Sequence, residues 1–209
     1  MVIPEVSLHV VHRGHDRRDC FFSEADYLAY LDYLREFAAR FACSVHAYCL
    51  MTNHVHLLMT PHAPEACALL MKYTAQYYVN RINKQLHRIG TLWQGRFYSC
   101  LVPTERYALT CYRYIELNPV EAGMVRHPAD YRWSSYSSNT GRAGTGFLRP
   151  HPAYEALSDD HRTRASSYSA LFDLPLEQSV VNEIRKATRG GYALGADRKR
   201  RGRPPRGGK

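Results

Sequence analysis

The chain has 209 residues, of which 45% are hydrophobic, so its length suits one domain with an extension or two small domains. It has no apolar run of about 18 residues, which excludes a membrane span, and its start lacks the charged-then-apolar layout of a signal peptide. We therefore expect a cytoplasmic protein. The six cysteines form no C-x-x-C pair, which argues against a zinc ribbon or a redox motif.

The positive charge is concentrated at one end of the chain. Residues 198–209 carry seven basic side chains and no acidic one, and so account for seven of the nine net positive charges. Such an arm favours nucleic acid, because basic residues displace the counterions of a phosphate backbone. A solvated, disordered end that aids solubility has the same composition.

The first half of the chain predicts strands and helices in a definite order. Residues 6–14 alternate and are rich in valine, which predicts a strand, and Ser23 opens a helix that should run to about residue 42. Residues 44–51 and 54–60 predict two strands, which the polar pair Thr52–Asn53 joins as a tight turn. We therefore expect a strand, a helix and a hairpin over residues 6–60.

The pattern continues with a helix, a strand and another helix. Pro64 suits the first position of a helix that Gly90 ends, and residues 96–103 predict a fourth strand. Thr104 caps a helix that reaches about Leu117, where Pro119 breaks it. This order predicts an α+β fold with a ferredoxin-like antiparallel sheet and helices on one face.

Two histidines stand two residues apart in the predicted hairpin. His54 and His56 point to the same face of their strand, and Val55 points to the other face. Two adjacent imidazoles on a sheet can hold one divalent cation. The alternative is a pair of hydrogen-bonded, half-buried histidines without a ligand.

A tyrosine and an amide lie close together near the end of the third predicted helix. Tyr114 and Asn118 are four residues apart and so share a helical face, and Asn118 offers a neutral oxygen as a third metal ligand. Tyr112 lies about 200° away around the helix and should face the core. Tyr107, two turns earlier, lies on the same side of the helix as Tyr114 and is the other nearby tyrosine that could face the histidines.

Five segments of the chain carry a family resemblance. They are HVVHRG, NHVHLL, GTLWQGRFYS, YRYIELNPVEAG and YRWSSY, in this order between about residues 6 and 136. Together they resemble the REP-associated tyrosine transposases, which belong to the HUH single-strand DNA transposases related to the IS200/IS605 elements. The resemblance implies an HUH nuclease domain over residues 1–136. We expect a partly helical C-terminal extension over residues 137–197 and a basic disordered tail over residues 198–209.

The resemblance also implies a mechanism and a substrate. It implies His54 and His56 as ligands of a divalent cation, Mg²⁺ or Mn²⁺, with Asn118 as the matching third ligand, and Tyr114 as the nucleophile that forms a 5′-phosphotyrosine. The implied substrate is single-stranded DNA that folds into a palindromic, REP-like hairpin. Such an enzyme would be cytoplasmic and associated with the bacterial nucleoid. Its oligomeric state stays open between a monomer and a homodimer.

Single-stranded DNA is bound by basic contacts combined with stacking aromatic side chains. The predicted DNA contacts are Arg13, Arg17, Arg18, Lys72, Arg81, Trp93 and Arg96. Two alternatives remain from the sequence. One is a metal-dependent nuclease that uses water, with a structural Tyr114. The other is a non-catalytic or degenerate ferredoxin-like nucleic-acid-binding protein.

Overall fold

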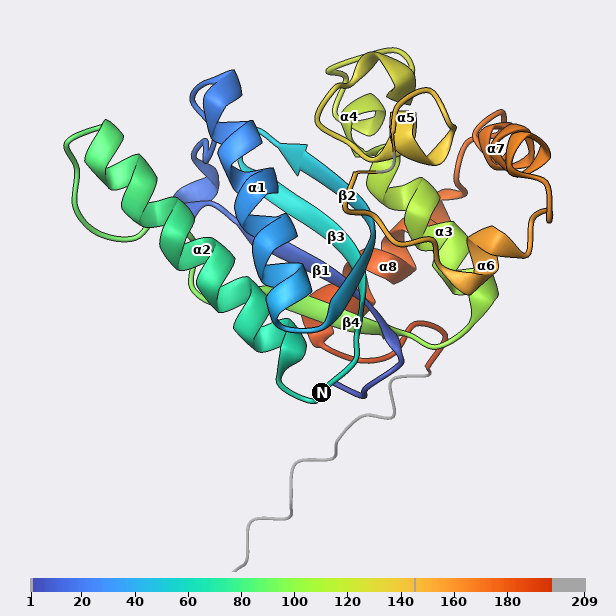
Figure 1. Cartoon of the computed structure of the whole chain (residues 1–209), viewed down its shortest axis with the longest axis horizontal. Helices are drawn as coiled ribbons and strands as arrows, with labels where there is room; N and C mark the ends of the chain where they lie inside the picture. Colours follow the sequence, from blue (N-terminus) through green and yellow to red (C-terminus); the bar gives the residue numbers. More distant parts are fainter. Residues whose placement is uncertain (1, 145, 197–209) are drawn as a thin grey trace, which may run out of the picture.

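The computed structural model describes residues 2–144 and 146–196, so the predicted basic tail lies outside the described residues. Its centre is a four-stranded sheet in which all neighbouring strands are antiparallel (Figure 1). The strands are β1 (Ser7–Arg13), β2 (Cys43–Met51), β3 (His54–Pro61) and β4 (Tyr98–Val102), in the order β2-β3-β1-β4. This confirms the predicted α+β, ferredoxin-like sheet.

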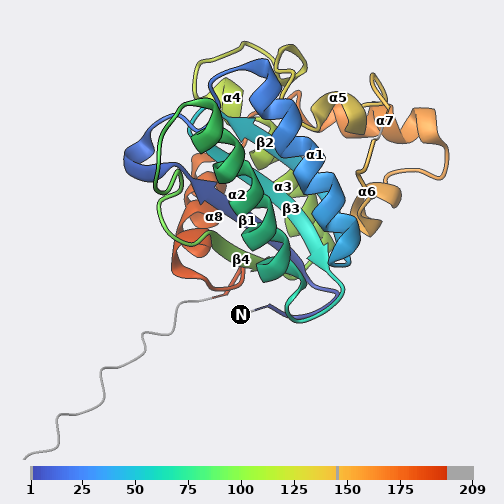
Figure 2. The same ribbon diagram turned by 60° about the vertical axis from the view of Figure 1, so that its left-hand side comes forward.

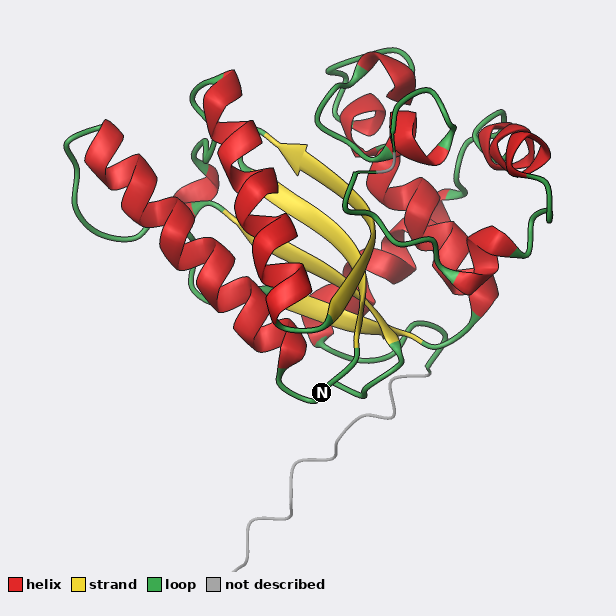
Figure 3. Cartoon of the chain, viewed as in Figure 1, coloured by secondary structure: helices red, strands yellow, loops and turns green. Residues whose placement is uncertain are grey.

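The helices are α1 (Glu24–Arg40), α2 (Ala66–Gln85), α3 (Glu105–Glu116), α4 (Asn118–Glu121), α5 (Tyr136–Asn139), α6 (Pro152–Glu155), α7 (His161–Ala170) and α8 (Gln178–Gly190) (Figure 3). Helix α2 is shorter at both ends than predicted, and its C-terminal end comes before Gly90, because His87 already has a φ of 49°. In the described part of the chain, each helix is too short or too polar to cross a membrane.

Helices α1 and α2 lie side by side on one face of the sheet (Figures 1 and 2). Their apolar stripes, which include Leu34 and Tyr78, pack on alternate strand residues such as Val55 and Leu57. Each fully buried side chain of this size stabilises the fold by roughly 1.5–3 kcal/mol relative to an exposed one. The layer between this face and the two helices is the larger hydrophobic core.

The other face of the sheet is covered as well, which corrects the prediction of helices on one face. Helix α3 packs against β2 and β3, and α8 packs against β4 (Figure 2). The physical reason is that strand residues on this face, such as Ala47, Leu58 and Cys100, are also apolar and need cover. Residues after 136 therefore help to cover the sheet that residues before 136 form.

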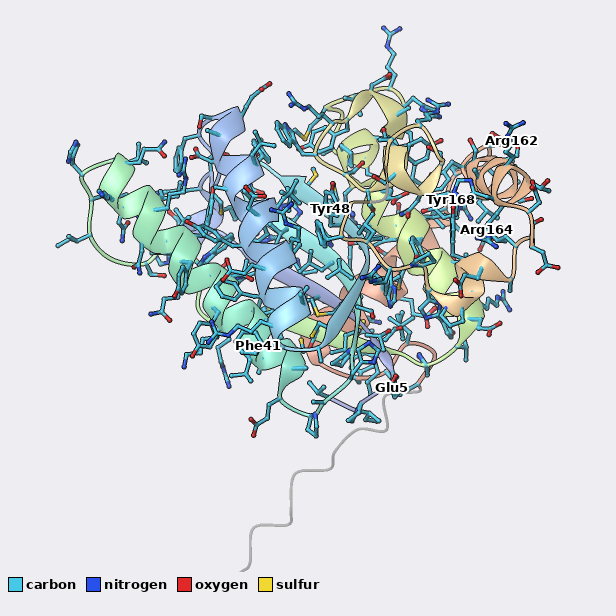
Figure 4. The ribbon with its side chains drawn as sticks, in the orientation of Figure 1. Glu5, Phe41, Tyr48, Arg162, Arg164 and Tyr168 are labelled. Atoms are coloured by element: carbon cyan, nitrogen blue, oxygen red, sulfur yellow. The ribbon has the colours of Figure 1, made fainter. Side chains whose placement is uncertain are left out.

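A buried carboxylate ties α3 to the C-terminal half of the chain. Glu116 is fully buried and accepts hydrogen bonds from Ser135, Asn139 and Tyr168. Figure 4 shows Tyr168 on α7, on the side next to α3. Burial raises the pKa of Glu116 to about 7, against the effect of these three donors. The network holds the end of α3 in a fixed position, two residues from Tyr114.

A second buried polar group leads to a prediction about acid stability. His46 is buried, its Nδ1–H donates to the Arg149 carbonyl, and its Nε2 accepts from the Thr60 hydroxyl. Burial lowers the pKa of His46 from 6.5 to about 4. The unfolded chain therefore takes up a proton before the folded one, so this contribution to stability is complete above pH 6.5 and is lost as the pH falls towards 4.

We expect His46→Gln to flatten the dependence of stability on pH. A difference of about 2.5 pKa units corresponds to about 3 kcal/mol. Between pH 6.5 and 4, the free energy of unfolding in urea should fall by about that much more in the unmutated protein than in the variant. Other buried histidines contribute equally to both proteins, so the comparison isolates His46. Parallel pH profiles would contradict the expectation.

Candidate functional site

A pocket of about 700 Å³ opens on the sheet face that carries α3 and α8. Its walls come from all four strands and from α3, α4 and α8, so distant parts of the sequence meet there. The pocket is lined by His9, Val11, Arg13, Arg17, Met51, His54, His56, Gln94, Tyr98, Tyr114, Asn118, Glu121, Ala122, Arg185, Thr188 and Arg189. It therefore brings together all four residues for which a metal-binding or catalytic role was predicted.

The hairpin presents both histidines to this pocket. Strand β3 begins at His54, directly after the Thr52–Asn53 turn, and pairs with β1 so that His54 faces Arg13 and His56 faces Val11. The ring centroids of His54 and His56 are 4.9 Å apart. Val55 lies on the opposite face, in the core with α1 and α2. The alternation expected from the sequence thus holds in the structure.

Both histidines are held through their Nδ1 atoms. His54 Nδ1 lies 2.6 Å from Asn53 Oδ1, and His56 Nδ1 lies 3.0 Å from His9 Nε2. Asn53 is itself oriented, because its side-chain nitrogen donates to the Arg17 carbonyl. An outer hydrogen bond at Nδ1 is the usual arrangement for a histidine that binds a metal through Nε2. The Nε2 atoms of this pair make no hydrogen bond among the described residues.

The pair is uncharged at neutral pH. Burial lowers the pKa of His54 to about 4, and the positive charge of Arg13 acts in the same direction. Burial likewise brings the pKa of His56 well below its ordinary value, assisted by His54 and His9. Neutral imidazoles carry the lone pairs that a cation needs, so protons do not compete for the site at pH 7.

Tyr114 lies directly against the histidines. Its ring makes edge-to-face contacts with His56, at a centroid distance of 5.6 Å, and with His9, at 5.5 Å. Burial raises the pKa of the Tyr114 phenol, while a hydrogen bond and the positive charge of Arg185 lower it. Tyr112, by contrast, is fully buried among other tyrosines, as its position on the helix predicted.

Asn118 is placed by the break after α3. Pro119 cannot donate a backbone hydrogen bond, so α3 ends at Glu116 and the short helix α4 begins at Asn118. The Asn118 side-chain nitrogen donates to the Tyr114 carbonyl at 2.6 Å. Its Oδ1 atom makes no hydrogen bond within the described residues, and the side chain lines the pocket. The predicted continuous helical face is thus replaced by a side-chain cap, yet both residues reach the same site.

These atoms fit a divalent cation. Two imidazole Nε2 atoms and one amide oxygen are ligand types that such ions accept, and phosphate oxygens or water can supply the remaining positions. No group of three His, Cys, Asp or Glu side chains with the spacing of a metal site occurs in residues 2–144 and 146–196. A third protein ligand would therefore be a neutral oxygen such as that of Asn118.

The pocket has a strongly positive lining. Four arginines border it, namely Arg13, Arg17, Arg185 and Arg189, against one carboxylate, Glu121. Burial lowers the pKa of Arg13, and the charges of Arg189 and Arg17 lower it further, so these cations are close enough to repel one another. A site with this excess of positive charge is suited to a phosphate backbone.

Four other predicted DNA contacts do not line the pocket. Arg18 is exposed beside Asp16, and Arg96 is exposed in the loop before β4. Lys72 and Arg81 are on α2, which covers the opposite face of the sheet. None of these four lines the pocket.

Trp93 requires a correction. Its side chain is only 3% exposed and stacks on His12 at a centroid distance of 4.3 Å, within the core that includes Tyr30 and Tyr78. A buried indole cannot stack on a base, so Trp93 is a packing residue and not a DNA contact. Tyr98 is 42% exposed, lines the pocket and is better placed for stacking.

Besides Tyr98, sequence reasoning missed other residues of the site, among them His9, Arg185, Thr188 and Arg189. His9 could have been found, because it alternates with Arg13 along β1 and so shares that face. The three residues of α8 share one side of an amphipathic helix with spacings of three and four, but this pattern does not indicate where the helix docks.

Comparison with known proteins places this chain in a family. Residues 2–118, more than half of the chain, match the family model described as "Transposase IS200 like". A Haemophilus influenzae protein named "Putative REP-associated tyrosine transposase" is 26% identical over 122 residues, which cover 50% of this chain and 69% of that protein.

A solved structure is similar in fold. It is described as "Structure of the REP associates tyrosine transposase bound to a REP hairpin" and superposes with a TM-score of 0.61 over 73% of this chain and 90% of that one, at 15% sequence identity. The match extends the shared fold beyond the segment that the family model covers. With its ferredoxin-like sheet, its paired histidines and a tyrosine against them, the chain belongs to the IS200-like transposase family.

Proposed function

We propose that this transposase cleaves and rejoins single-stranded DNA next to palindromic hairpins, through a covalent 5′-phosphotyrosine at Tyr114 and with a divalent cation. The observation that carries the proposal is the contact of Tyr114 with His56, inside a pocket bordered by four arginines. The side chains proposed as nucleophile, as metal ligands and as phosphate contacts thus line one pocket. The hairpin bound to the structural relative supports the choice of substrate.

The Tyr114 hydroxyl would act as the nucleophile. Its oxygen attacks the scissile phosphorus, the bond from phosphorus to the 3′ oxygen breaks, and a bond from phosphorus to the tyrosine oxygen forms. The phenol loses its proton to solvent, and the departing 3′ oxygen gains one. Arg185 lowers the pKa of the Tyr114 phenol, so it would favour the phenolate during attack.

His54 Nε2, His56 Nε2 and Asn118 Oδ1 would hold the cation, as Mg²⁺ or Mn²⁺. When bound, the cation offsets the negative charge of the scissile phosphate. Arg13 and Arg17 would orient the neighbouring phosphates from the rim of the pocket. Asn118 also holds the Tyr114 carbonyl, so it links the ligand set to the nucleophile.

The covalent product would allow rejoining without an external energy source. The tyrosine ester retains the energy of the phosphodiester, and attack by another 3′ hydroxyl transfers the strand and releases the Tyr114 phenol. A nuclease that uses water loses this energy on cleavage. Strand transfer and hydrolysis can therefore be distinguished by whether DNA becomes attached to the protein.

The test is a cleavage assay on oligonucleotides that fold into a palindromic hairpin with single-stranded flanks, in the presence of Mn²⁺. With the label at the 3′ end, the DNA should migrate with the protein on a denaturing gel. With the label at the 5′ end, it should appear as a shorter free fragment. A fully duplex DNA of the same sequence is the control and should remain intact. Cleavage without any protein-linked label would contradict the phosphotyrosine.

A further inference from the structure

A chain of hydrogen bonds leads from His56 away from the pocket. His56 Nδ1 lies 3.0 Å from His9 Nε2, and His9 Nδ1 lies 2.8 Å from the Thr188 hydroxyl on α8. The rings of His9 and His56 are nearly parallel, with an interplanar angle of 6°. All three side chains are buried, at 1–4% exposure.

The positions of the heavy atoms allow two directions of donation. In one direction His56 Nδ1–H donates to His9, whose Nδ1–H donates to Thr188, and the Thr188 hydroxyl donates to Cys100 Sγ at 3.3 Å. In the other direction Thr188 donates to His9, and His9 donates to His56. The second direction leaves the proton of a neutral His56 on Nε2, where it blocks metal binding.

We propose that Thr188 and His9 are positioning residues, which fix His56 as the Nδ1–H tautomer and so keep its Nε2 lone pair open to the divalent cation. The proposal rests on the metal site of the proposed function. Thr188 belongs to the C-terminal helix α8, outside residues 2–118 of the family match. The C-terminal extension of this chain would thus complete the active site and not merely cover the sheet.

The burial of His9 makes the hydroxyl of Thr188 decisive. His9 is 1% exposed, so an Nδ1–H without an acceptor would be costly. Without the Thr188 hydroxyl, His9 would carry its proton on Nε2 and donate to His56, and the proton of His56 would move to its own Nε2. Loss of one hydroxyl at α8 therefore reverses the tautomer at the metal ligand. Outer partners of metal-binding histidines typically change affinity by about 10–100-fold.

The experiment compares Mn²⁺ affinity, by titration of the full-length protein, among five variants and the unmutated protein. Thr188→Val keeps the shape of the side chain and removes the hydroxyl, and we expect about 10–100-fold weaker binding. Thr188→Ser restores the hydroxyl and should bind Mn²⁺ nearly as well as the unmutated protein. Thermal denaturation of each variant verifies that the fold is intact.

A double substitution separates positioning from packing. His9→Gln places an amide oxygen near the former Nε2, where it can accept from His56 Nδ1–H without Thr188. In that background, Thr188→Val should weaken Mn²⁺ binding no further. If Thr188→Val lowers affinity equally in both backgrounds, it acts through packing, and the inference is overturned.

A spectroscopic measurement tests the tautomer without any metal. Long-range ¹H–¹⁵N NMR of the metal-free protein should show His9 and His56 as Nδ1–H tautomers, and His56 as Nε2–H in Thr188→Val. An Nε2–H tautomer of His56 in the unmutated protein would overturn the inference. Loss of Mn²⁺ binding in His56→Ala with unchanged binding in Thr188→Val would overturn it and leave the proposed function standing. An unmutated protein that binds no Mn²⁺ would overturn both.

Discussion

Tyr114→Phe should abolish DNA cleavage and the protein–DNA adduct while the protein remains folded and able to bind hairpins. The change removes only the phenolic oxygen and keeps the ring contacts with His56 and His9. We expect the cleavage rate to fall by at least about 1000-fold, which corresponds to about 4 kcal/mol. The measurement is single-turnover cleavage of a labelled hairpin, together with a gel-shift assay for binding.

Two matched controls identify the tyrosine. Tyr98 also lines the pocket, and Tyr98→Phe should retain cleavage. Tyr107 is the other candidate nucleophile that helix spacing suggested. Its hydroxyl donates a hydrogen bond to Glu183 on α8, and it does not line the pocket. Tyr107→Phe should therefore be active too. Peptide mapping of the trapped adduct then gives the attached residue directly. A nucleotide on Tyr98 or Tyr107 would refute the assignment of Tyr114.

The same variant separates the proposal from its rivals. A nuclease that activates water would still cut DNA with Phe at position 114, because the ring supplies its packing. A non-catalytic binding protein would cut with neither residue. Only a tyrosine nucleophile predicts an adduct in the unmutated protein and loss of both cleavage and adduct in Tyr114→Phe.

His56→Ala and His54→Ala should each abolish metal-dependent cleavage and leave hairpin binding largely intact. Each removes one of two imidazole ligands, and we expect Mn²⁺ affinity to fall by more than about 100-fold, beyond the usual effect of an outer partner. DNA affinity should persist, because the pKa of His54 is about 4 and that of His56 is also low. Neither substitution removes a positive charge at pH 7.

The matched control is an arginine of the same pocket. Arg13 lies opposite His54 in the sheet, and Arg13→Gln removes a charge without removing a predicted ligand. It should weaken hairpin binding and reduce its dependence on salt concentration, with a slope smaller by about 0.7–0.9 for each phosphate that the variant no longer neutralises. Full cleavage by His56→Ala in a chelator-treated buffer would exclude the metal assignment.

Local sequence determined much of this site. The shared face of His54 and His56 follows from strand alternation, and the division between Tyr114 and Tyr112 follows from helix geometry. The hairpin turn, the cap at Thr104 and the break at Pro119 also depend on neighbouring residues, so the sequence predicts them. The domain boundary at residue 136 and the role of the basic tail remain predictions.

Only the tertiary structure decided which residues from distant parts of the sequence meet at the site. Thr188 meets His9 across 179 residues of sequence, and no local pattern encodes that meeting. The burial of Trp93 could not be predicted either, because the local sequence around an aromatic loop residue does not indicate whether it packs inward or stacks on a base. The helices on the second face were missed for a related reason. Periodicity shows that a helix has an apolar side, but the surface that receives this side is set by packing of the whole chain.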